Sequence, residues 1–514
     1  MFTIGLFIAV LSVLIYVYVI KPQNYWKNKG VKHNKPVFLF GDTYKTSLQQ
    51  ENFSTFVERI YNNFKNERYF GWYQFTTPIL MINDVDLIKR IGIKDFDHFH
   101  DHPGYSHEDI DPLWNKNLFA INGEKWRNMR TTLSPSFTSS KMKIMFNLLN
   151  DCAEQFALYF KEQKEDVITV ELKDIFTRYT NDVIATAAFG IKCDSLRDKD
   201  NEFYKNGLSI TDFSGIEILK FFMFQISPTL AKLLKYKLIP DKSANFFGKV
   251  ILDSIKMREE QGIVRPDMIH LLMQARKGNM DEDEEVTKVT KNKRTEITDE
   301  DIIAQAIIFF VAGFDSSATL MYFLAYELAV NPNIQAKLRE DIMKTDEECD
   351  GKITYEALMK MKYLDMIISE TLRKWPPTPI TDRICIKEYT IPSERPDEKP
   401  LVIEKGTVIW FPIHAMQRDP NHFEDPERFD PERFSDENKS KIDAASFITF
   451  GIGPRNCIGS RFALMETKIL IYHILKNFEI VPVQKSVIPV VLSKKHFNMT
   501  AEGGMWFGLK KLDA

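Results

Sequence analysis

The segment from residue 299 to about residue 330 constrains the fold more than any other part of the chain. It is apolar almost all the way around a helix, so it has no polar face to turn toward solvent. Thr298 is a candidate N-cap, and the three residues after it are acidic, which suits the positive end of a helix dipole. Asn331-Pro332 marks the end. The sequence therefore predicts one long, buried and central helix.

Other segments predict further helices and a few short strands. Residues 98–125 and 278–300 are rich in polar and charged side chains and are expected to be loops. Residues 218–234 are apolar but interrupted by Pro228, which is compatible with a core helix or with a shallow membrane contact. Helical spacing covers 124–145, 141–163, 168–190, 354–374 and 460–477, while strands are expected in 72–82, at 401–403 and at 408–412.

The N-terminal stretch predicts a membrane anchor. Residues 2–20 carry no charge and come close to the 20 or so apolar residues that span the hydrocarbon core of a bilayer. No basic residue precedes this stretch, which favours an anchor over a cleaved signal peptide. Several lysines follow at once, and the first acidic residue is Asp42. By the positive-inside rule, the rest of the chain is then expected in the cytosol.

Charge and cysteine usage exclude several classes of protein. The net charge is −3, without the basic balance of a nucleic-acid-binding surface. The five cysteines are far apart and form no Cys-x-x-Cys pair, so a structural zinc site or an iron–sulfur cluster is not expected. A disulfide framework is not expected either, which is consistent with a reducing compartment.

Polar residues interrupt the long apolar helix at Ala312–Ser317. A glycine inside a buried helix costs about 1 kcal/mol relative to alanine, and the neighbouring acid and hydroxyls add to that cost. Gly313 could serve a close helix contact with Asp315 held in a salt bridge. The alternative is a groove that binds something small, with a proton source beside it. The residues alone leave both readings open.

The stretch 450–459, FGIGPRNCIG, places one cysteine in a crowded turn. Cys457 is expected at the start of a helix that begins near Ile458, where free amides and the helix dipole would lower the pKa of its thiol. Such a thiolate could be a nucleophile or a metal ligand, but no histidine pattern supports a nucleophile. A single thiolate with Arg455 nearby suits one axial bond to a haem iron, whose propionates need cations.

Several motifs, taken in order along the chain, resemble the cytochrome P450 family. The similarity covers nearly the whole chain, including the N-terminal anchor, and looks closest to the insect microsomal branch that metabolises xenobiotics. The motifs are Trp126-x-x-x-Arg130, Ala312–Ser317, Glu370-x-x-Arg373, the Pro431–Phe434 cassette, and the haem-thiolate signature Phe450-x-x-Gly453-x-Arg455-x-Cys457-x-Gly459.

The resemblance implies a mainly α fold with a small β subdomain, preceded by a single transmembrane helix, and haem b as the cofactor. It also implies a role for each residue of the site. Cys457 would be the axial iron ligand with Phe450 beside its sulfur; Arg455, Arg130, Trp126 and Arg383 would hold the haem propionates; Asp315 and Ser316 would line the O₂ groove and relay protons; Glu370, Arg373 and Arg433 would form a buried structural triad; and Phe309, Phe310, Ala312, Phe314, Thr378 and Met499 would line the substrate pocket.

The chain departs from the family at Ser316, where threonine is usual. The hydroxyl is kept but the methyl group is lost, and serine is more mobile about χ1 than a β-branched residue. We therefore expect looser control of water, and less product for each NADPH consumed, than with threonine.

The activity implied by the resemblance is a monooxygenase that inserts one oxygen atom of O₂ into apolar small molecules, with xenobiotics as the expected substrates. NADPH–cytochrome P450 reductase would supply the electrons, since the chain has no flavin or nicotinamide motif, and cytochrome b5 is a second candidate partner. The reductase is expected near Lys125 and Arg127. Alternatives are a hydroxylase of endogenous lipids or hormones, an isomerase of peroxides, and a non-catalytic protein that sequesters haem or ligand.

The expected organisation is an anchor at 1–21, a basic hinge at 22–40 and a catalytic haem domain at 41–514. The localisation is expected to be the endoplasmic reticulum membrane, with a single pass, membrane lipid around the anchor, and the catalytic domain in the cytosol. No nucleic-acid partner is expected.

Overall fold

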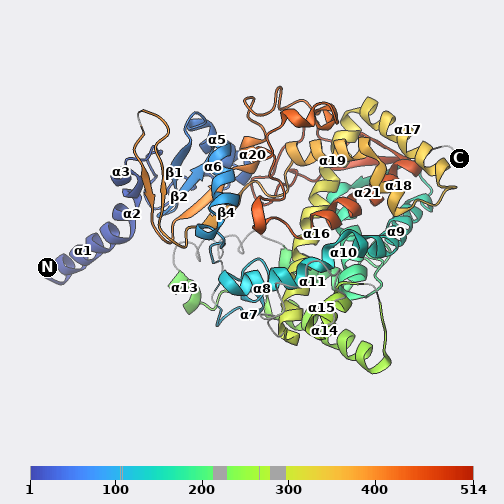
Figure 1. Ribbon diagram of the computed structural model, residues 1–514, viewed down its shortest axis with the longest axis horizontal. Coiled ribbons are helices and arrows are strands. Elements are labelled where there is room, and N and C mark those ends of the chain that lie inside the picture. The colour runs from blue at the N-terminus through green and yellow to red at the C-terminus, as the bar shows by residue number, and fades with distance from the viewer. Residues whose placement is uncertain are drawn as a thin grey trace.

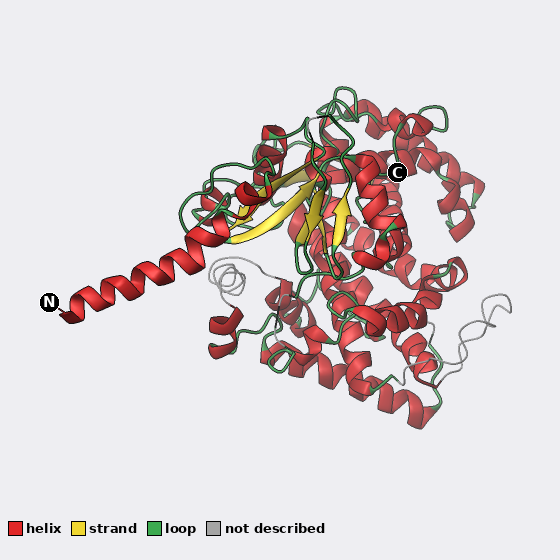
Figure 2. Ribbon diagram, turned by 60° about the vertical axis from the view of Figure 1, so that its left-hand side comes forward, coloured by secondary structure: helices red, strands yellow, loops and turns green. Residues whose placement is uncertain are grey.

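The structure is a computed structural model that describes residues 2–104, 106, 108–211, 228–265, 267–277, 297–396 and 398–512. A helical body carries a smaller β-rich part at the end from which α1 projects (Figures 1 and 2). The described helices are α1 (Phe2–Ile15), α2 (Lys21–Gln23), α3 (Tyr25–Lys29), α4 (Tyr44–Ser47), α5 (Phe53–Asn63), α6 (Val85–Lys89), α7 (Pro112–Asn115), α8 (Gly123–Leu133), α9 (Ser139–Lys161), α10 (Leu172–Phe189), α11 (Glu202–Thr211), α13 (Pro228–Leu233), α14 (Asp241–Gln261), α15 (Met268–Lys277), α16 (Asp299–Val330), α17 (Pro332–Glu348), α18 (Tyr355–Lys360), α19 (Lys362–Lys374), α20 (Ile413–Met416) and α21 (Ser460–Asn477).

Three small sheets accompany the helices. The largest has the order β1-β2-β7-β4, in which only β2 and β7 run parallel. A second sheet has the order β3-β9-β8, and β5 pairs with β6. The strands are β1 (Tyr69–Gln74), β2 (Thr77–Ile82), β3 (Val167–Glu171), β4 (Thr381–Ile384), β5 (Tyr389–Ile391), β6 (Leu401–Ile403), β7 (Val408–Phe411), β8 (Phe478–Val481) and β9 (Trp506–Lys511).

The long helix α16 is the centre of the helical body, as predicted. The Thr298 hydroxyl accepts a hydrogen bond from the backbone of Asp301, whose carboxylate accepts one from the backbone of Thr298, so the helix begins with a complete capping box. It runs through the body in contact with α10, α11, α14 and α21 (Figure 1). Most of its side chains are buried, which accounts for its apolar surface.

Three predicted helices differ from the structure. The expected helix at 124–145 is broken after α8 ends at Leu133, because a 3₁₀ turn at Ser134–Phe137 precedes α9. Residues 168–171 were expected to be helical but belong to β3, which pairs with β9 near the C-terminus. Pairing with so distant a partner leaves no local signal in the sequence. The expected helix at 354–374 is interrupted at Met361 into α18 and α19. The predicted helix at 460–477 matches α21.

The first helical segment is long and apolar enough to cross a membrane: together with a π-helical turn, α1 and α2 run from Phe2 to Gln23. The segment after it, for which a basic hinge at 22–40 was expected, packs against β1 through Trp26. Trp26 is 2 % exposed, and its indole Nε1 donates to the carbonyl of Trp72 over 3.2 Å. Gly71 lets this indole lie directly against β1, because a Cβ at that position would collide with it.

The apolar stretch expected at 218–234 lies partly outside the described residues. Its described part starts at Pro228, where α13 begins.

Candidate functional site

Cys457 lies in a tight loop that is built by its glycines. Gly453 has φ +71°, and a side chain there would collide with the carbonyl of Gly92. The Cys457 amide donates to the carbonyl of Phe450 over 2.8 Å and closes the loop. The loop therefore fixes where the sulfur lies relative to the helix that follows.

The Cys457 side chain is uncovered, although its sulfur lies deep among the protein atoms. Burial raises the pKa of this thiol above its usual value, while the amides of Gly459 and Ser460 and the nearby Arg130 act to lower it. The expectation of a lowered pKa was therefore wrong in its direction, because desolvation outweighs the amides. The amides nevertheless point at the sulfur, from a helix that begins at Ser460 rather than near Ile458.

Arg455 holds the same loop to the segment before α8. Its guanidinium donates to the carbonyls of His100, Leu118 and Ile121 at 2.8–3.1 Å. It also lies over the ring of Trp126, with 4.3 Å between the guanidinium carbon and the ring centroid. The structure thus brings together two residues that lie more than 300 positions apart.

Arg383 and Arg130 complete a concentration of positive charge around the loop. Arg383 donates to the carbonyl of Ile452, while its Nε is buried with no partner among the described residues. Burial and the neighbouring Arg383 lower the pKa of Arg455 to about 9, and burial lowers that of Arg383 to about 10. Because these cations are incompletely balanced, an anionic group such as a haem propionate would be stabilised among them.

His102 belongs to this cluster and was missed by the sequence reasoning. Its Nδ1 lies 2.5 Å from Oδ1 of Asp382, and its ring stacks on Phe119. Burial lowers the pKa of His102, and Arg383 and Arg455 act in the same direction. The only signal in the sequence was the abundance of Asp and His in the loop 98–125.

Asp315 is held by two partners that come from distant parts of the chain. Nζ of Lys173, in the first turn of α10, lies 2.6 Å from its Oδ1. The side-chain amide of Asn498 donates to its Oδ2 over 2.8 Å. The Ser316 hydroxyl donates back to the carbonyl of Ala312, as serine often does within helices.

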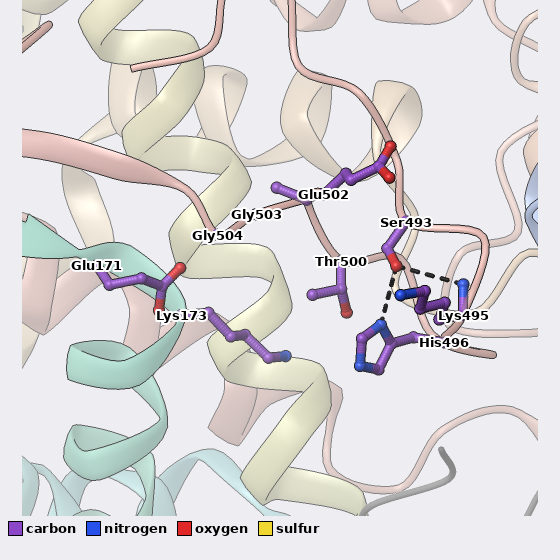
Figure 3. A pocket seen from close by; sticks show the side chains of 10 residues that line it. Glu171, Lys173, Ser493, Lys495, His496, Thr500, Glu502, Gly503 and Gly504 are labelled. Carbon is purple, nitrogen blue, oxygen red and sulfur yellow. Dashed lines mark hydrogen bonds between the residues drawn. The ribbon is translucent and has the colours of Figure 1, made fainter. Parts of the chain in front are cut away.

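A pocket of about 360 Å³, lined mostly by polar residues, opens beside Lys173 (Figure 3). Lys173 lines it, so the pocket brings solvent close to the group that holds Asp315. The Ser493 hydroxyl and the His496 ring form a hydrogen bond of 3.0 Å on the opposite wall. The remaining lining comprises Glu171, Lys495, Thr500, Ala501, Glu502, Gly503 and Gly504.

The structure brings Glu370, Arg373 and Arg433 together as a buried ionic cluster. Arg373 donates to both carboxylate oxygens of Glu370, at 2.7 and 2.8 Å, and neither side chain is exposed. Nε of Arg433 lies 3.5 Å from the same carboxylate, and its Nη2 donates to the carbonyl of Asp425. The i, i+3 pair on α19 is therefore part of the core.

Two of the six expected substrate contacts lie elsewhere. Phe310 and Phe314 are buried on the side of α16 that faces α10, α11 and α14, where Phe310 contacts Phe189, Phe203 and Phe247. Each phenylalanine is two residues from Ala312, and two steps of about 100° place it on nearly the opposite side of the helix. We therefore correct the expectation that they line the substrate pocket.

The other four expected contacts have different surroundings. Phe309 is partly buried against Phe137, and Thr378 is exposed. Met499 is buried, and its carbonyl accepts a hydrogen bond from the Tyr322 hydroxyl. Ala312 is exposed although it lies in the middle of a helix most of whose residues are buried.

These observations fit a flat, dianionic cofactor such as haem. Cys457 and the small residue Ala312 are both exposed, and the buried arginines Arg383 and Arg455 lie at the cysteine loop. A single thiolate is a sufficient protein ligand for a haem iron, and cations neutralise the propionates. The residues present therefore suit the group that the sequence motifs implied.

Comparison with known proteins identifies the same family as the sequence motifs. A profile of the cytochrome P450 family matches residues 32–506. The chain is 43 % identical to cytochrome P450 9e2 of Blattella germanica, covering 98 % of this chain and 97 % of that protein. It is 41 % identical to probable cytochrome P450 9f2 of Drosophila melanogaster, covering 98 % of each chain. It is 37 % identical to cytochrome P450 6k1 of Blattella germanica, covering 97 % of this chain and 95 % of that protein.

Proposed function

Because the chain belongs to the cytochrome P450 family and is therefore a haem b monooxygenase, we propose that it oxidises apolar xenobiotics at a membrane surface with electrons from a reductase. The observation that carries the proposal is the setting of Cys457. The residue is exposed, its sulfur faces the amides of Gly459 and Ser460, and a cluster of arginines lies beside it.

Cys457 would be the axial ligand of the iron. When bound, the haem supplies the centre at which O₂ is reduced, and a thiolate ligand favours cleavage of the O–O bond. Coordination to a metal displaces the thiol proton, which is released to solvent, so the raised pKa of the free thiol is no obstacle. Phe450 would shield the sulfur, while Arg455, Arg130, Arg383 and Trp126 would hold the propionates.

Asp315 and Ser316 would move protons into the site. Lys173 and Asn498 hold the Asp315 carboxylate, and Lys173 also lines a pocket that is open to solvent. A proton entering through this pocket would reach Asp315, and the adjacent Ser316 hydroxyl would pass it toward the reacting oxygen. General acid groups of this kind typically accelerate a step by about 10²–10⁴-fold. Lys173 acts here as a positioning residue.

The substrate would lie against the uncovered side of α16. Ala312 is small and exposed there. Phe309, which contacts Phe137, lies about one turn earlier on the helix and would add an aromatic side chain to the substrate site. Thr378 is exposed on the segment after α19, and Met499 belongs to the C-terminal loop that also carries Asn498. Apolar contacts of this kind suit xenobiotics, and a hydroxylase of endogenous lipids or hormones is the alternative.

Two neighbouring features support attachment to the endoplasmic reticulum membrane. The helix from Phe2 to Gln23 is apolar and almost wholly exposed. A tight turn follows in which Val37 and Gly41 exchange backbone hydrogen bonds, which leaves Phe38, Leu39 and Phe40 exposed at its tip. Gln23 donates to the carbonyl of Val37 and ties the tip to the end of the helix. Both apolar surfaces would then face the same bilayer.

The electron donor would be NADPH–cytochrome P450 reductase, with cytochrome b5 as a second partner. Lys125 is exposed on α8, the helix that also carries Trp126 and Arg130. Arg127 is already paired with Asp97 at 2.6 Å, so Lys125 is the better candidate for a contact with an acidic partner. Such rim contacts act mainly on the rate of association.

Reconstitution tests the proposal as a whole. The full chain would be placed in lipid vesicles with the reductase, NADPH and isotopically labelled O₂. Binding spectra recorded with pesticides, plant toxins and fatty acids would choose the substrates. We expect one labelled oxygen atom in the product, and no product from Cys457→Ser. A protein that binds haem and ligand but yields no product would instead be a sequestering protein.

A further inference from the structure

Two buried carboxylates lie beside the arginine cluster, and each is held by a histidine. Nδ1 of His102 lies 2.5 Å from Oδ1 of Asp382, and Nδ1 of His100 lies 2.6 Å from Oδ1 of Asp101. All four residues are at most 9 % exposed. The charges of both acids act on Arg455. The two carboxylates that could neutralise this arginine are therefore engaged with imidazole rings.

The guanidinium groups of the cluster are bound by neutral oxygens instead. Arg383 donates to the carbonyls of Asp382 and Ile452, over 2.6 and 3.2 Å. Arg455 donates to Oδ1 of Asn122 over 3.1 Å, in addition to its three backbone carbonyls. Among the residues that the structure describes, neither arginine forms an ion pair with a carboxylate. Neutral oxygens satisfy the N–H donors without cancelling the charge, so both cations stay available to an anion.

His102 engages its carboxylate without adding a positive charge. Burial lowers the pKa of His102, against the opposing effect of Asp382, so the neutral ring donates its Nδ1–H to the carboxylate. The ring stacks on Phe119, with 4.7 Å between the centroids. The side chain of Asn122 donates to the carbonyl of His102 over 3.2 Å and accepts from Arg455. The histidine is thus fixed in orientation and tied to the arginine that it serves.

We propose that His102 is a positioning residue for the cofactor: it holds the Asp382 carboxylate so that Arg383 and Arg455 keep their charge for the haem propionates. A carboxylate close to a guanidinium group ordinarily forms a strong charge-assisted pair with it. Without the imidazole donor, Asp382 would turn toward these arginines and compete with a propionate. The inference rests on the proposed function, which places the propionates at these arginines.

The rate at which the holoprotein loses haem to an acceptor protein tests this role. His102→Phe keeps an aromatic ring against Phe119 but removes the donor, so we expect haem to be lost several-fold faster. Asp382→Asn removes the competing charge and should lose haem no faster than the wild type. In the double variant, the rate should return to within about twofold of that of Asp382→Asn. Equally fast loss from His102→Phe and from the double variant would overturn the proposal.

A conservative variant separates the hydrogen bond from the packing of the ring. In His102→Asn, the side-chain amide can donate to the carboxylate from nearly the position of Nδ1, so haem should be retained almost as in the wild type. Fast loss from this variant would overturn the proposal. His102→Leu also removes the donor, carries the same expectation as His102→Phe, and keeps the test valid if the phenylalanine variant fails to fold. His422→Ala, in the loop after α20, is the control and should behave as the wild type.

Failure of this inference is distinguishable from failure of the proposed function. If Arg455→Lys loses haem quickly while His102→Phe does not, the propionates lie at the arginines but the role of His102 is wrong. If neither variant loses haem faster than the wild type, the propionates lie elsewhere and both are wrong. Ligation by Cys457 is measured separately, because the carbon monoxide spectrum of the reduced, haem-loaded His102→Phe protein should match that of the wild type.

Discussion

Nζ of Lys173 lies 2.6 Å from Oδ1 of Asp315, across the contact between α10 and α16. The same ammonium group donates to the Thr319 hydroxyl over 2.9 Å. The acid that we propose as a proton donor is therefore tied to a neighbouring helix and is not free to turn within its own. Any account of proton delivery in this protein has to include the lysine.

Removing the lysine charge should uncouple the enzyme. In Lys173→Met the aliphatic stem is kept but Asp315 loses its cation, so we expect product formed per NADPH to fall about 10-fold. Lys173→Arg keeps the positive charge and should retain most of the product formed per NADPH. The pH profile and the solvent isotope effect on turnover should change in Lys173→Met. Lys205→Met, which removes a surface ion pair with Asp200, is the control. Equal coupling in all the variants would contradict the role of Lys173.

Replacing Arg455 with lysine should weaken cofactor retention. The guanidinium contacts three carbonyls and lies over Trp126, and a lysine cannot reproduce this fork. We expect Arg455→Lys to be purified with a lower haem-to-protein ratio and to lose haem several-fold faster to an acceptor protein. Arg461→Lys, an exposed position on α21, should behave as the wild type. An unchanged rate of haem loss would argue against the arginine cluster as the propionate site.

The apolar tip at residues 38–40 should touch lipid. Leu39 holds φ +67°, which is uncommon for a branched residue and exposes its side chain beside Phe38. In Phe38→Trp, the added fluorescence should be quenched by brominated lipid when the full chain is placed in vesicles. Met343 is exposed on α17, at the far side of the body from α1 (Figure 1). The fluorescence added by Met343→Trp should therefore not be quenched by brominated lipid. Equal quenching at both positions would count against a bilayer contact at the tip.

Stability should fall at alkaline pH because Glu466 is a carboxyl group buried on α21. Its folded pKa of about 8 lies above the ordinary 4.5, so the folded protein binds a proton that the unfolded chain has released. The resulting loss of stability starts above the ordinary pKa, grows as the pH rises through about 8, and then levels off. Glu466→Gln has no such proton. The melting temperature of the wild type should therefore drop relative to the variant between about pH 6 and pH 9, and parallel curves would refute the assignment.

The features that the sequence predicted well are those with a local cause. The capping box at Thr298 and the apolar surface of α16 lie within one segment, as do the glycines around Cys457. Each follows from short-range sterics or from the spacing of apolar residues, so a single stretch of sequence is enough to reveal it.

The features that were not predicted from the sequence depend on partners far away in the chain. β3 exists because β9 pairs with it, and Asp315 is held by Lys173 and Asn498, which lie far from it in the chain. The direction of the Cys457 pKa was missed for a similar reason. Desolvation by the whole fold outweighs the local amides, and the amount of protein around a sulfur cannot be read from its neighbours in sequence.

The optical spectrum of the reduced protein with carbon monoxide tests the central claim most directly. With the sulfur of Cys457 as axial ligand, the wild-type protein should show the strongly red-shifted Soret band of a thiolate-ligated complex, and Cys457→Ser should lose it. A wild-type band at the shorter wavelength typical of histidine ligation, or a red-shifted band that persists in the variant, would contradict the account.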